Sequence, residues 1–477
     1  MQTSASRREL DRDSCPEVRI SDVLSGLSCG LDLAEGYPRG HAIRTCLIGM
    51  RIAEELQIDG AERAALFYTL LLKDVGGSAN ASKICHLFGA DDRTVKQHLK
   101  TVDWANLSET IRFMSRNVMP DGAPLQRILR AVVFALEGPG GPRKLIQTRR
   151  EHGSDLTRRL GLSEATAVAI GQVDERWDGR GHPAGLKEEE ISLYGRLASL
   201  AQAIECAFAA GGIAAAVHVA RDRRGTWYDP TLVDALLATS GDNDFWGRVA
   251  GPDPHTELAR LKPEHQVLQG DEATLDRIAR IFSEVVDGKS PWTFRHSTGV
   301  AQIAVGIAKA LGLSESTLSQ IHRAGLLHDI GKLGTSNLIL DKPGNLTSEE
   351  YLELRRHPRY THEILDRIAA FQDIAEMAAT HHERLDGRGY HRGIAAVDLP
   401  IESRLIVVAD ICEALSAKRP YRDALPREKV HEILEQDAGT AVCPECVEAL
   451  KIYHDRVETI SRVNAQLEEL DRVLQGV

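Results

Sequence analysis

Apolar residues recur every three to four positions along most of this chain, which is the spacing of one face of an α-helix. Two such stretches, 40–56 and 295–311, each place a histidine (His41 or His296) ahead of a run of small and aliphatic residues. A third stretch, 450–474, puts leucines on one face of a terminal helix. The pattern predicts an all-α protein.

The helical pattern occurs twice, in the same order, in the two halves of the chain. Residues 40–56 match 295–311 and residues 71–77 match 326–332, both at an offset of 255 positions. Further along, 174–183 matches 382–391 and 225–230 matches 439–444. Four matches in one order indicate a tandem duplication, and the period is much longer than that of a solenoid repeat.

The duplication and the composition divide the chain into two helical domains joined by a linker. A stretch rich in Gly, Pro and Asp begins near residue 240 and reads as the linker. We expect an N-terminal tail, a first domain, the linker, a second domain and a C-terminal helix, with the bounds 1–20, 21–240, 241–268, 269–455 and 456–477. The last helix has two possible roles, a homodimer contact or packing on the second domain, and the sequence does not choose between them.

Composition and charge exclude several classes of protein. With 477 residues, the chain is too long for one ordinary core. Its 58 Lys and Arg against 69 Asp and Glu leave a net charge of -11, which argues against binding duplex nucleic acid. The chain contains no run of eighteen apolar residues, so we expect no membrane span. The start lacks a signal-peptide core, and eight scattered cysteines favour reduced thiols and a cytoplasmic location.

Two pairs of adjacent residues carry the candidate chemistry, His328-Asp329 and His381-His382. Imidazole together with carboxylate suits iron, manganese, zinc or nickel better than magnesium or calcium. Neighbours on a helix diverge by about 100°. Each pair therefore ligates most easily at a helix end, or by addressing two different ions, and the two pairs predict a two-metal hydrolytic centre. By contrast, Cys443 and Cys446 have metal-like spacing but no second pair nearby, so we interpret them as ordinary thiols.

The second half, from 271 to 453, resembles HD-GYP domains, a branch of the HD metal-dependent phosphohydrolases. Each motif alone is weak, and their joint order is specific. The resemblance rests on His296, His328-Asp329, Lys332, His357 in Arg-His-Pro, His381-His382, Asp410 in Val-Val-Ala-Asp and the run 414–422. It implies a helical fold and hydrolysis of the bacterial second messenger cyclic di-GMP to the linear dinucleotide or GMP.

The resemblance also implies a role for each matched residue. The implied metal ligands are His296, His328, Asp329, His357, His381, His382 and Asp410. Asp329 would bridge two divalent ions, iron or manganese first, with nickel or zinc as alternatives. Lys332 would neutralise a phosphate oxygen, so Asp329 and Lys332 are the expected catalytic pair. The expected substrate contacts are Lys332, the loop residues Gly387, Gly389 and Tyr390, and the fork-shaped donors Arg419 and Arg422.

The second half departs from the family pattern at three positions. His391 stands where the family has proline, which makes the loop less stiff. Trp292 stands where members with three metals carry a glutamate, which favours two metals. Glu413 replaces the aspartate of the familiar Asp-Ala-Leu. Nearby, Glu383 and Asp386 have two open roles, as acceptors for ligand histidines or as anchors of the glycine turn.

The first half keeps little of this ligand set. His41 and Asp74 survive, whereas Lys73 and Gly77 replace the histidine and lysine of the first motif. The later ligand positions hold Val173, Asp174 and Gln202, and the region 149–152 cannot be aligned. An ammonium at Lys73 would repel a dication, so we expect a scaffold or regulatory domain. Whether this domain binds a nucleotide stays open.

Two alternatives to cyclic di-GMP hydrolysis stay open. The first is hydrolysis of another cyclic dinucleotide or of a nucleotide phosphate. The second is a non-hydrolysing cyclic-dinucleotide receptor that acts through protein contacts. Expected partners are a cyclic dinucleotide and either a second copy of the chain or a signalling protein.

Overall fold

The computed structural model describes residues 19–474 except 101, 104, 105, 121, 137–139, 262–270, 294 and 419–422. The predicted tail up to residue 18, Arg419, Arg422 and the leucine side chains after 460 lie outside the described residues. In the described ranges the regular elements are helices, with two isolated bridges and no strand. The all-α prediction is confirmed.

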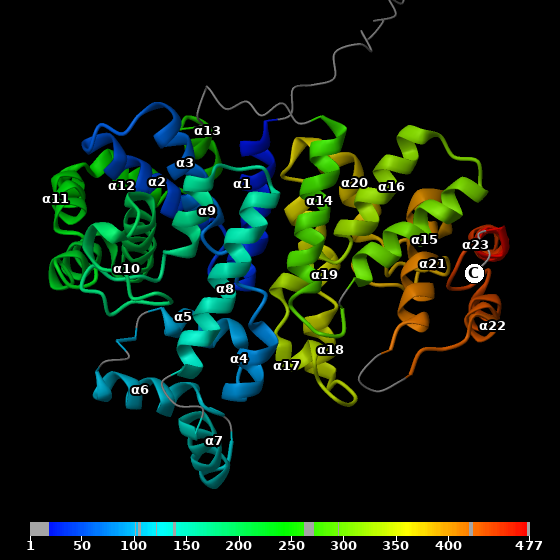
Figure 1. Ribbon diagram of the computed structural model, residues 1–477, viewed down its shortest axis with the longest axis horizontal. Coiled ribbons are helices and arrows are strands. Elements are labelled where there is room, and N and C mark those ends of the chain that lie inside the picture. The colour runs from blue at the N-terminus through cyan, green and yellow to red at the C-terminus, as the bar shows by residue number, and fades with distance from the viewer. Residues whose placement is uncertain are drawn as a thin grey trace, which may run out of the picture.

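The two halves lie side by side (Figure 1). The first half contains α1 (Ile20–Ala34), α2 (His41–Glu55), α3 (Gly60–Leu72), α4 (Ala81–Phe88), α5 (Asp92–Leu99), α6 (Leu107–Asn117), α7 (Pro124–Leu136), α8 (Gly140–Arg159), α9 (Glu164–Gly171), η1 (Glu188–Glu190), α10 (Leu193–Asp222), α11 (Pro230–Ala238), η2 (Thr239–Gly241), α12 (Asn243–Val249) and α13 (Pro254–Ala259). The second half contains α14 (Glu272–Asp287), α15 (His296–Ala310), α16 (Glu315–Leu327), η3 (Ile330–Gly334), α17 (Asn337–Leu340), α18 (Ser348–Leu354), α19 (His357–Leu365), η4 (Ala369–Phe371), α20 (Gln372–Ala379), η5 (Ala396–Asp398), α21 (Ile401–Ser416), α22 (Arg427–Asp437) and α23 (Pro444–Leu474).

The halves repeat one helical arrangement. In the first half α2 packs against α3 and α10, and in the second half α15 packs against α16 and α21. The histidine-led helices found in the sequence are therefore the central helix of each half. The first half differs by an insertion, α4 to α7, which together with Leu145 of α8 forms a small core around Phe88 and Phe113. Helices α6 and α7 project from the body (Figure 1).

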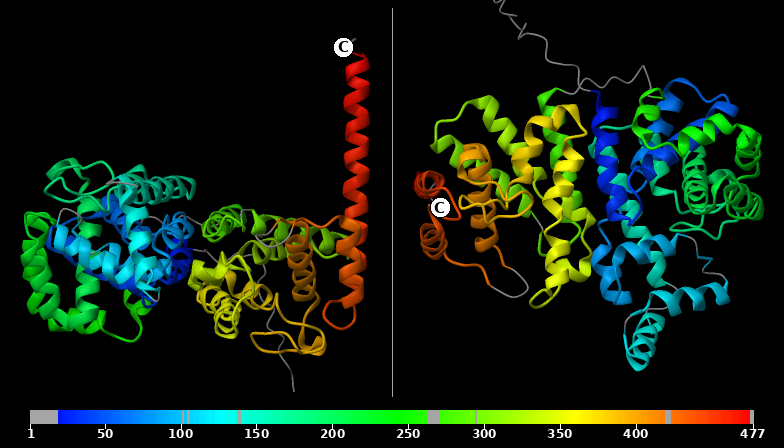
Figure 2. Two further views of the ribbon diagram at one scale, coloured as in Figure 1. Left: turned by 90° about the horizontal axis from the view of Figure 1, so that it is seen from below. Right: turned by 180° about the vertical axis from the view of Figure 1, so that it is seen from behind.

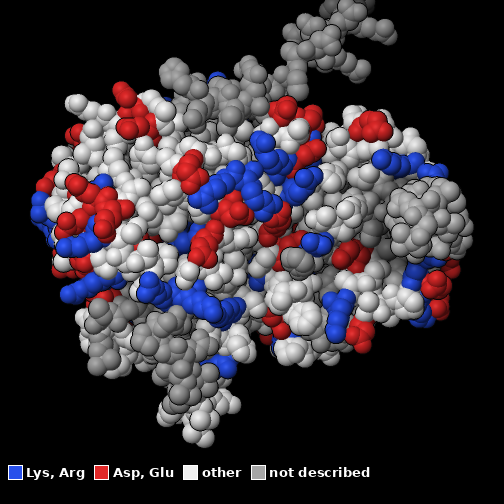
Figure 3. All heavy atoms as spheres, viewed as in Figure 1, with Lys and Arg blue, Asp and Glu red and all other residues white. Residues whose placement is uncertain are grey.

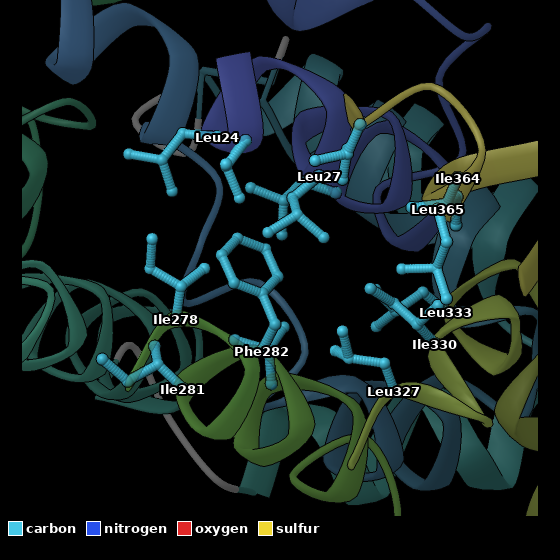
Figure 4. Packing of buried hydrophobic residues seen from close by; sticks show 14 of the residues in the cluster. Leu24, Leu27, Ile278, Ile281, Phe282, Leu327, Ile330, Leu333, Ile364 and Leu365 are labelled. Atoms are coloured by element: carbon cyan, nitrogen blue, oxygen red, sulfur yellow. The ribbon is translucent and has the colours of Figure 1, made fainter. Parts of the chain in front are cut away.

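One hydrophobic core runs through both halves. Helix α1 of the first half packs against η3 and α19 of the second half. In Figure 4, Leu24 and Leu27 of α1 face Phe282 of α14, and Leu333 and Ile364 of the second half lie beside them. Each fully buried side chain of this size contributes about 1.5–3 kcal/mol. The shared core therefore fixes the position of η3, which follows the first candidate metal pair.

A buried polar contact joins the halves as well. The Asp92 carboxylate at the start of α5 accepts the backbone N–H of Asn337 at 3.0 Å. It also pairs with the ammonium groups of Lys96 at 3.1 Å and Lys289 at 3.4 Å. All four residues are buried. A carboxylate removed from water in this way needs these partners, so α5 is tied to the segment that follows η3.

The predicted linker is wrong in its first part, because 243–259 folds as α12 and α13. Their aromatic and aliphatic residues, including Trp246 and Leu258, are buried in the core. Asp242 and Asp253, which read as loop residues, cap the two helices by accepting backbone N–H groups. At the other end, α23 begins at Pro444 rather than at 456, and its last part projects from the body (Figure 2).

One described helix, α10, is long and apolar enough to cross a membrane by length and composition. Only 22% of its most apolar window is buried, yet its first part supplies the core residues Leu197, Leu200 and Ile204. Gly211 and Gly212 leave the helical conformation, so the helix is broken in the middle. A single helix with these features is weak evidence for a membrane span.

Candidate metal centre

The predicted ligands sit at helix ends that converge on one point. His296 is the first residue of α15 and His357 the first of α19. The pair His328-Asp329 directly follows α16, and the pair His381-His382 follows α20 by one residue. Both pairs therefore lie where the helical turn ends, which is the arrangement that lets two neighbours point to one centre. The remaining residue, Asp410, projects from the middle of α21.

Asp329 stands at the middle of the cluster, with one carboxylate oxygen toward each side. Its Oδ2 lies 3.4 Å from His296 Nε2 and 3.3 Å from His328 Nε2. Its Oδ1 lies 3.4 Å from His357 Nε2 and 3.6 Å from His381 Nε2. Such a carboxylate has the position needed to bridge two ions.

Two groups of ligand atoms flank Asp329. In each group the atoms lie within 4.8 Å of one another; the groups are His296, His328 and Asp410, and His357, His381 and His382. Atoms about 2.0–2.2 Å from one ion are roughly 3 Å apart. The observed separations, such as 3.3 Å between His296 Nε2 and Asp410 Oδ1 and 3.0 Å between the Nε2 atoms of His357 and His381, fit that spacing.

The backbone fixes the tautomer of three of these histidines. The Nδ1 atoms of His328, His357 and His381 each contact a carbonyl oxygen three residues earlier, all at 2.7 Å. These carbonyls belong to the last turn of a helix or the turn before one. An Nδ1–H that donates outward leaves the Nε2 lone pair facing the centre, as metal binding requires.

The carboxylates of the cluster favour positive charge at this point. Against the effect of burial, Asp329, Asp410 and Glu413 raise the pKa of His296 well above 6.5, and Asp329 raises the pKa of His328. Burial would raise the pKa of Asp329, but Lys332 and His328 hold it well below its ordinary value. Burial and neighbouring imidazoles lower the pKa of His382 well below 6.5, so this ring is neutral. In addition, His328 Nε2 and Asp329 Oδ1 are buried without a hydrogen-bond partner. Such atoms are costly to bury unless a further group satisfies them, and a divalent ion is a group that would satisfy both.

Lys332 lies beside this centre, although not on a continued α-helix. The chain tightens into the 3₁₀ turn η3, and Lys332 Nζ lies 2.5 Å from Asp329 Oδ2. Its side chain is 20% exposed, so it is accessible to a ligand. Its predicted contact with a phosphate stays a prediction.

The loop 387–391 covers the His382 side of the centre. The Tyr390 ring lies 4.5 Å from the His382 ring, and the Arg355 guanidinium lies over Tyr390 at 4.7 Å. Gly389 approaches the backbone so closely that a Cβ there would be 2.5 Å from Glu383 Cα. His391 has φ of 99°, which a proline ring cannot adopt. The loop therefore takes a different path from a Gly-Tyr-Pro loop, beyond being less stiff.

Sequence reasoning missed the role of Glu413. Its carboxylate accepts from His296 Nδ1, which orients the histidine toward the centre. The signal was present, because Glu205 holds the matching position in the first half and bonds His41 in the same way. For Glu383, the anchoring role is correct: it accepts the backbone N–H groups of Arg392 and Gly393.

The first half replaces the ligand cluster with ion pairs. Gly76 lies against the backbone of Arg149 as Gly331 lies against that of His357, so Arg149 is the counterpart that the sequence could not assign. The Asp74 carboxylate pairs with Lys73, Arg149 and Lys100. Three cationic groups thus surround the carboxylate that corresponds to the bridging Asp329.

Histidines and aspartates that converge inside a helical bundle define the HD class of metal-dependent phosphohydrolases. The HD domain family model matches residues 141–232 and 280–445, more than half of the chain. The chain is 41% identical to the 3'3'-cGAMP-specific phosphodiesterase 3 of Vibrio cholerae, over 91% of this chain and 94% of that protein. It is 37% identical to a cyclic di-GMP phosphodiesterase of Thermotoga maritima, over 37% of this chain and 49% of that protein.

A solved structure is similar over most of the chain. The crystal structure of the cyclic GMP-AMP specific phosphodiesterase V-cGAP3 of V. cholerae has a TM-score of 0.65 and 36% identity, covering 92% of this chain and 98% of that one. The chain belongs to the HD domain family, in its HD-GYP branch, and is a phosphoric diester hydrolase. The family is metal-dependent, in keeping with the ligand clusters. The choice of cyclic di-GMP stays a prediction.

Proposed function

We propose that the second half hydrolyses a 3',3'-cyclic dinucleotide, with 3'3'-cGAMP as the preferred substrate. The observation that carries this choice is the extent of the similarity. The V. cholerae enzyme named for 3'3'-cGAMP matches across both halves, at 41% identity over 432 residues. Cyclic di-GMP is the second candidate, because relatives named for it match the catalytic region, one at 37% identity over 180 residues.

We assign the seven clustered residues to two divalent ions. His296, His328 and Asp410 would hold one ion, the three histidines at 357, 381 and 382 the other, and Asp329 both. Iron or manganese is the expected metal. When bound, two such ions lower the pKa of water toward neutrality and offset the charge of the phosphoryl oxygens.

The chain's own groups prepare this chemistry. A phosphodiester carries a negative charge that repels an incoming nucleophile, so a cation near the phosphate lowers the barrier. Lys332 is the candidate, since its ammonium already pairs with Asp329 and can reach an oxygen of the substrate. The ring of Tyr390, fixed between His382 and Arg355, forms a wall for the substrate beside the phosphate.

A turnover assay tests this proposal. The full-length protein is incubated with manganese or ferrous iron and with 3'3'-cGAMP, cyclic di-GMP or cyclic di-AMP, and the products are separated by chromatography. We expect a linear dinucleotide or mononucleotides, fastest from 3'3'-cGAMP, and no product from Asp329→Ala. Tight binding without product would favour the receptor, and cleavage restricted to non-cyclic nucleotides would favour the other phosphohydrolase.

A further inference from the structure

The first half contains a cavity of about 310 Å³ where the second half has its metal cluster. Val173, Asp174 and Gln202, which replace His381, His382 and Asp410, all line it, and so does Arg149. The volume is near the lower end for small-molecule sites. The duplicated domain has therefore lost its predicted ligands but kept a hollow at the same place.

The wall of this cavity is cationic. Six lining side chains carry a positive charge, Lys96, Lys100, Arg149, Arg176, Arg180 and Arg223. The lining carboxylates are Asp174, which Arg150 engages at 2.6 Å, and Glu175, which accepts the backbone N–H groups of 184–186. Lys96 also pairs with Asp92, and Arg176 pairs with Asp103 and Asp178, but none of these carboxylates lines the cavity. The lining itself therefore holds more positive than negative groups and favours an anion.

Four residues that line the cavity carry a buried polar atom without a hydrogen-bond partner, namely Asn80, Arg149, Arg176 and Gln202. The atoms Gln202 Oε1 and Arg149 Nε belong to residues that are 7% and 6% exposed. The Nη2 atom of Arg149 and the Nζ atom of Lys100 pair with Glu35, at 2.7 and 3.0 Å, and with Asp74. Neither carboxylate lines the cavity. An unsatisfied buried polar group costs about 1–3 kcal/mol of folding free energy. A ligand that forms hydrogen bonds with these atoms would offset that cost.

The rest of the wall suits a flat, apolar group. Leu145, Ile146 and Val219 line it together with Trp227. The guanidinium groups of Arg176 and Arg223 lie over the Trp227 ring at 4.3 and 3.9 Å, so both are held near the cavity. A nucleotide combines a planar base with an anionic phosphate and matches both parts of this lining.

We infer that the cavity of the first half binds a nucleotide and does not cleave it. The choice of a nucleotide rests on the proposed function, whereas the preference for an anion rests on the lining alone. The ammonium of Lys73 and the guanidinium of Arg149 occupy the positions of two metal-binding histidines. Of these two, Arg149 lines the cavity, where it and Lys100 are the charge partners for a phosphate, whereas Lys73 pairs with Asp74 and only removes a metal ligand.

A cation is the competing ligand, since His41, Glu205 and Cys206 place three donor atoms within 4.8 Å. Glu205 already bonds His41 Nδ1 and pairs with Arg44 at 2.7 Å. Burial and the nearby Lys73 lower the pKa of His41 to about 4, and burial raises the pKa of the Cys206 thiol. The positive surroundings therefore favour an anion over a metal ion.

Hydrogen exchange on the full-length Asp329→Ala protein tests this inference. The probes are 3'3'-cGAMP, cyclic di-GMP, GMP and AMP. Each is used at about 1 mM, which is high enough to detect binding with a millimolar Kd. We expect at least one probe to protect the segments 199–207 and 219–228, which line the cavity. Arg180→Glu reverses the charge of an exposed residue at the cavity and should reduce this protection at least about tenfold in apparent affinity.

Arg388→Glu is the matched control, because Arg388 is the exposed residue at the corresponding position of the second-half loop. It should leave the protection of 199–207 and 219–228 intact. Ala203→Trp, which fills the cavity, should abolish it, and melting curves verify the fold of each variant. The inference is overturned if every probe protects only second-half segments, or if protection is the same in Arg180→Glu. Hydrolysis by the unmodified protein is measured separately, so failure of the proposed activity is distinguishable from failure here.

Discussion

The two halves of this protein solve one electrostatic problem in opposite ways. Both place a carboxylate at the centre of a helical bundle, Asp74 in the first half and Asp329 in the second. The first half surrounds it with the cations of Lys73, Lys100 and Arg149. The second half surrounds it with imidazoles, whose inward lone pairs accept a metal ion. A buried carboxylate must have positive partners, and the fold admits either kind.

What the halves share belongs to the scaffold rather than to the chemistry. His41 bonds Glu205 as His296 bonds Glu413, and each histidine begins the central helix of its half. On the face in Figure 3, acidic and basic side chains are interspersed over both halves, whereas the residues that differ around Asp74 and Asp329 are buried. Variants at paired positions therefore separate structural from chemical roles.

The largest contrast is expected for the central carboxylates. Loss of a residue that only orients a metal ligand typically costs up to about 100-fold in activity. Asp329 is itself an assigned ligand, so Asp329→Ala should lower kcat/KM by more than about 100-fold and should remove bound metal. Asp74→Asn should leave the metal content per chain unchanged. Elemental analysis and turnover of both variants check this. A loss of metal in Asp74→Asn would mean that the first half also binds an ion, contrary to the comparison.

The next contrast concerns Arg149 and its counterpart His357. Arg149→Met leaves Glu35 and Asp74 with less positive charge in a buried place, and should lower the free energy of unfolding by about 3 kcal/mol. His357→Met should cost activity and metal, with a smaller loss of stability in protein freed of metal by a chelator. Urea unfolding of both variants measures the difference. Equal losses of stability would contradict the structural role assigned to the ion pairs of Arg149.

A third contrast concerns the contact between the halves, where Asp92 meets Lys96 and Lys289. Burial alone would raise the pKa of Asp92, but the two ammonium groups hold it below its ordinary value of 3.8. A depressed pKa contributes stability above the unfolded value, and that contribution is lost as the pH falls below about 3.9. Asp92→Asn should therefore cost about 2 kcal/mol at pH 7, and the difference from the unmodified protein should shrink below pH 4.

The control for Asp92 is Asp234→Asn, which removes an exposed ion pair with Arg224 and should cost less than about 1 kcal/mol at any pH. Urea unfolding between pH 7 and pH 3.5 gives both comparisons. A constant difference between Asp92→Asn and the unmodified protein across this range would refute the assigned charge state.

Local patterns predicted the part of this structure that depends on local interactions. Helical periodicity gave the all-α class, and the paired motifs identified the residues that meet at the centre. Arg149 was out of reach because the insertion α4 to α7 changes the offset between the halves, so that Asp74 and Arg149 are 75 positions apart whereas Asp329 and His357 are 28 apart. Only packing of Gly76 against Arg149 reveals the correspondence.

Capping residues misled the interpretation of the linker. Asp242 and Asp253 belong equally to loops and to helix N-termini, and the choice depends on whether the following apolar residues find a core. Here Trp246 reaches the core by packing on residues more than thirty positions away, such as Phe208. Contacts of that range leave no periodic signal in a short window of sequence.

The smallest contrast tests the scaffold pair that both halves keep. Glu413→Gln removes the charge that orients His296, and should weaken metal binding by about 10- to 100-fold while the protein stays folded. Glu205→Gln makes the same change beside His41 and should leave metal affinity and turnover unaltered, with a loss of stability as its only effect. Titration of metal-free protein with manganese, read by activity and by melting temperature, compares the two. If Glu205→Gln weakens metal binding as much as Glu413→Gln does, the two glutamates affect the metal site through the shared core. The orientation of His296 by Glu413 would then not explain the loss.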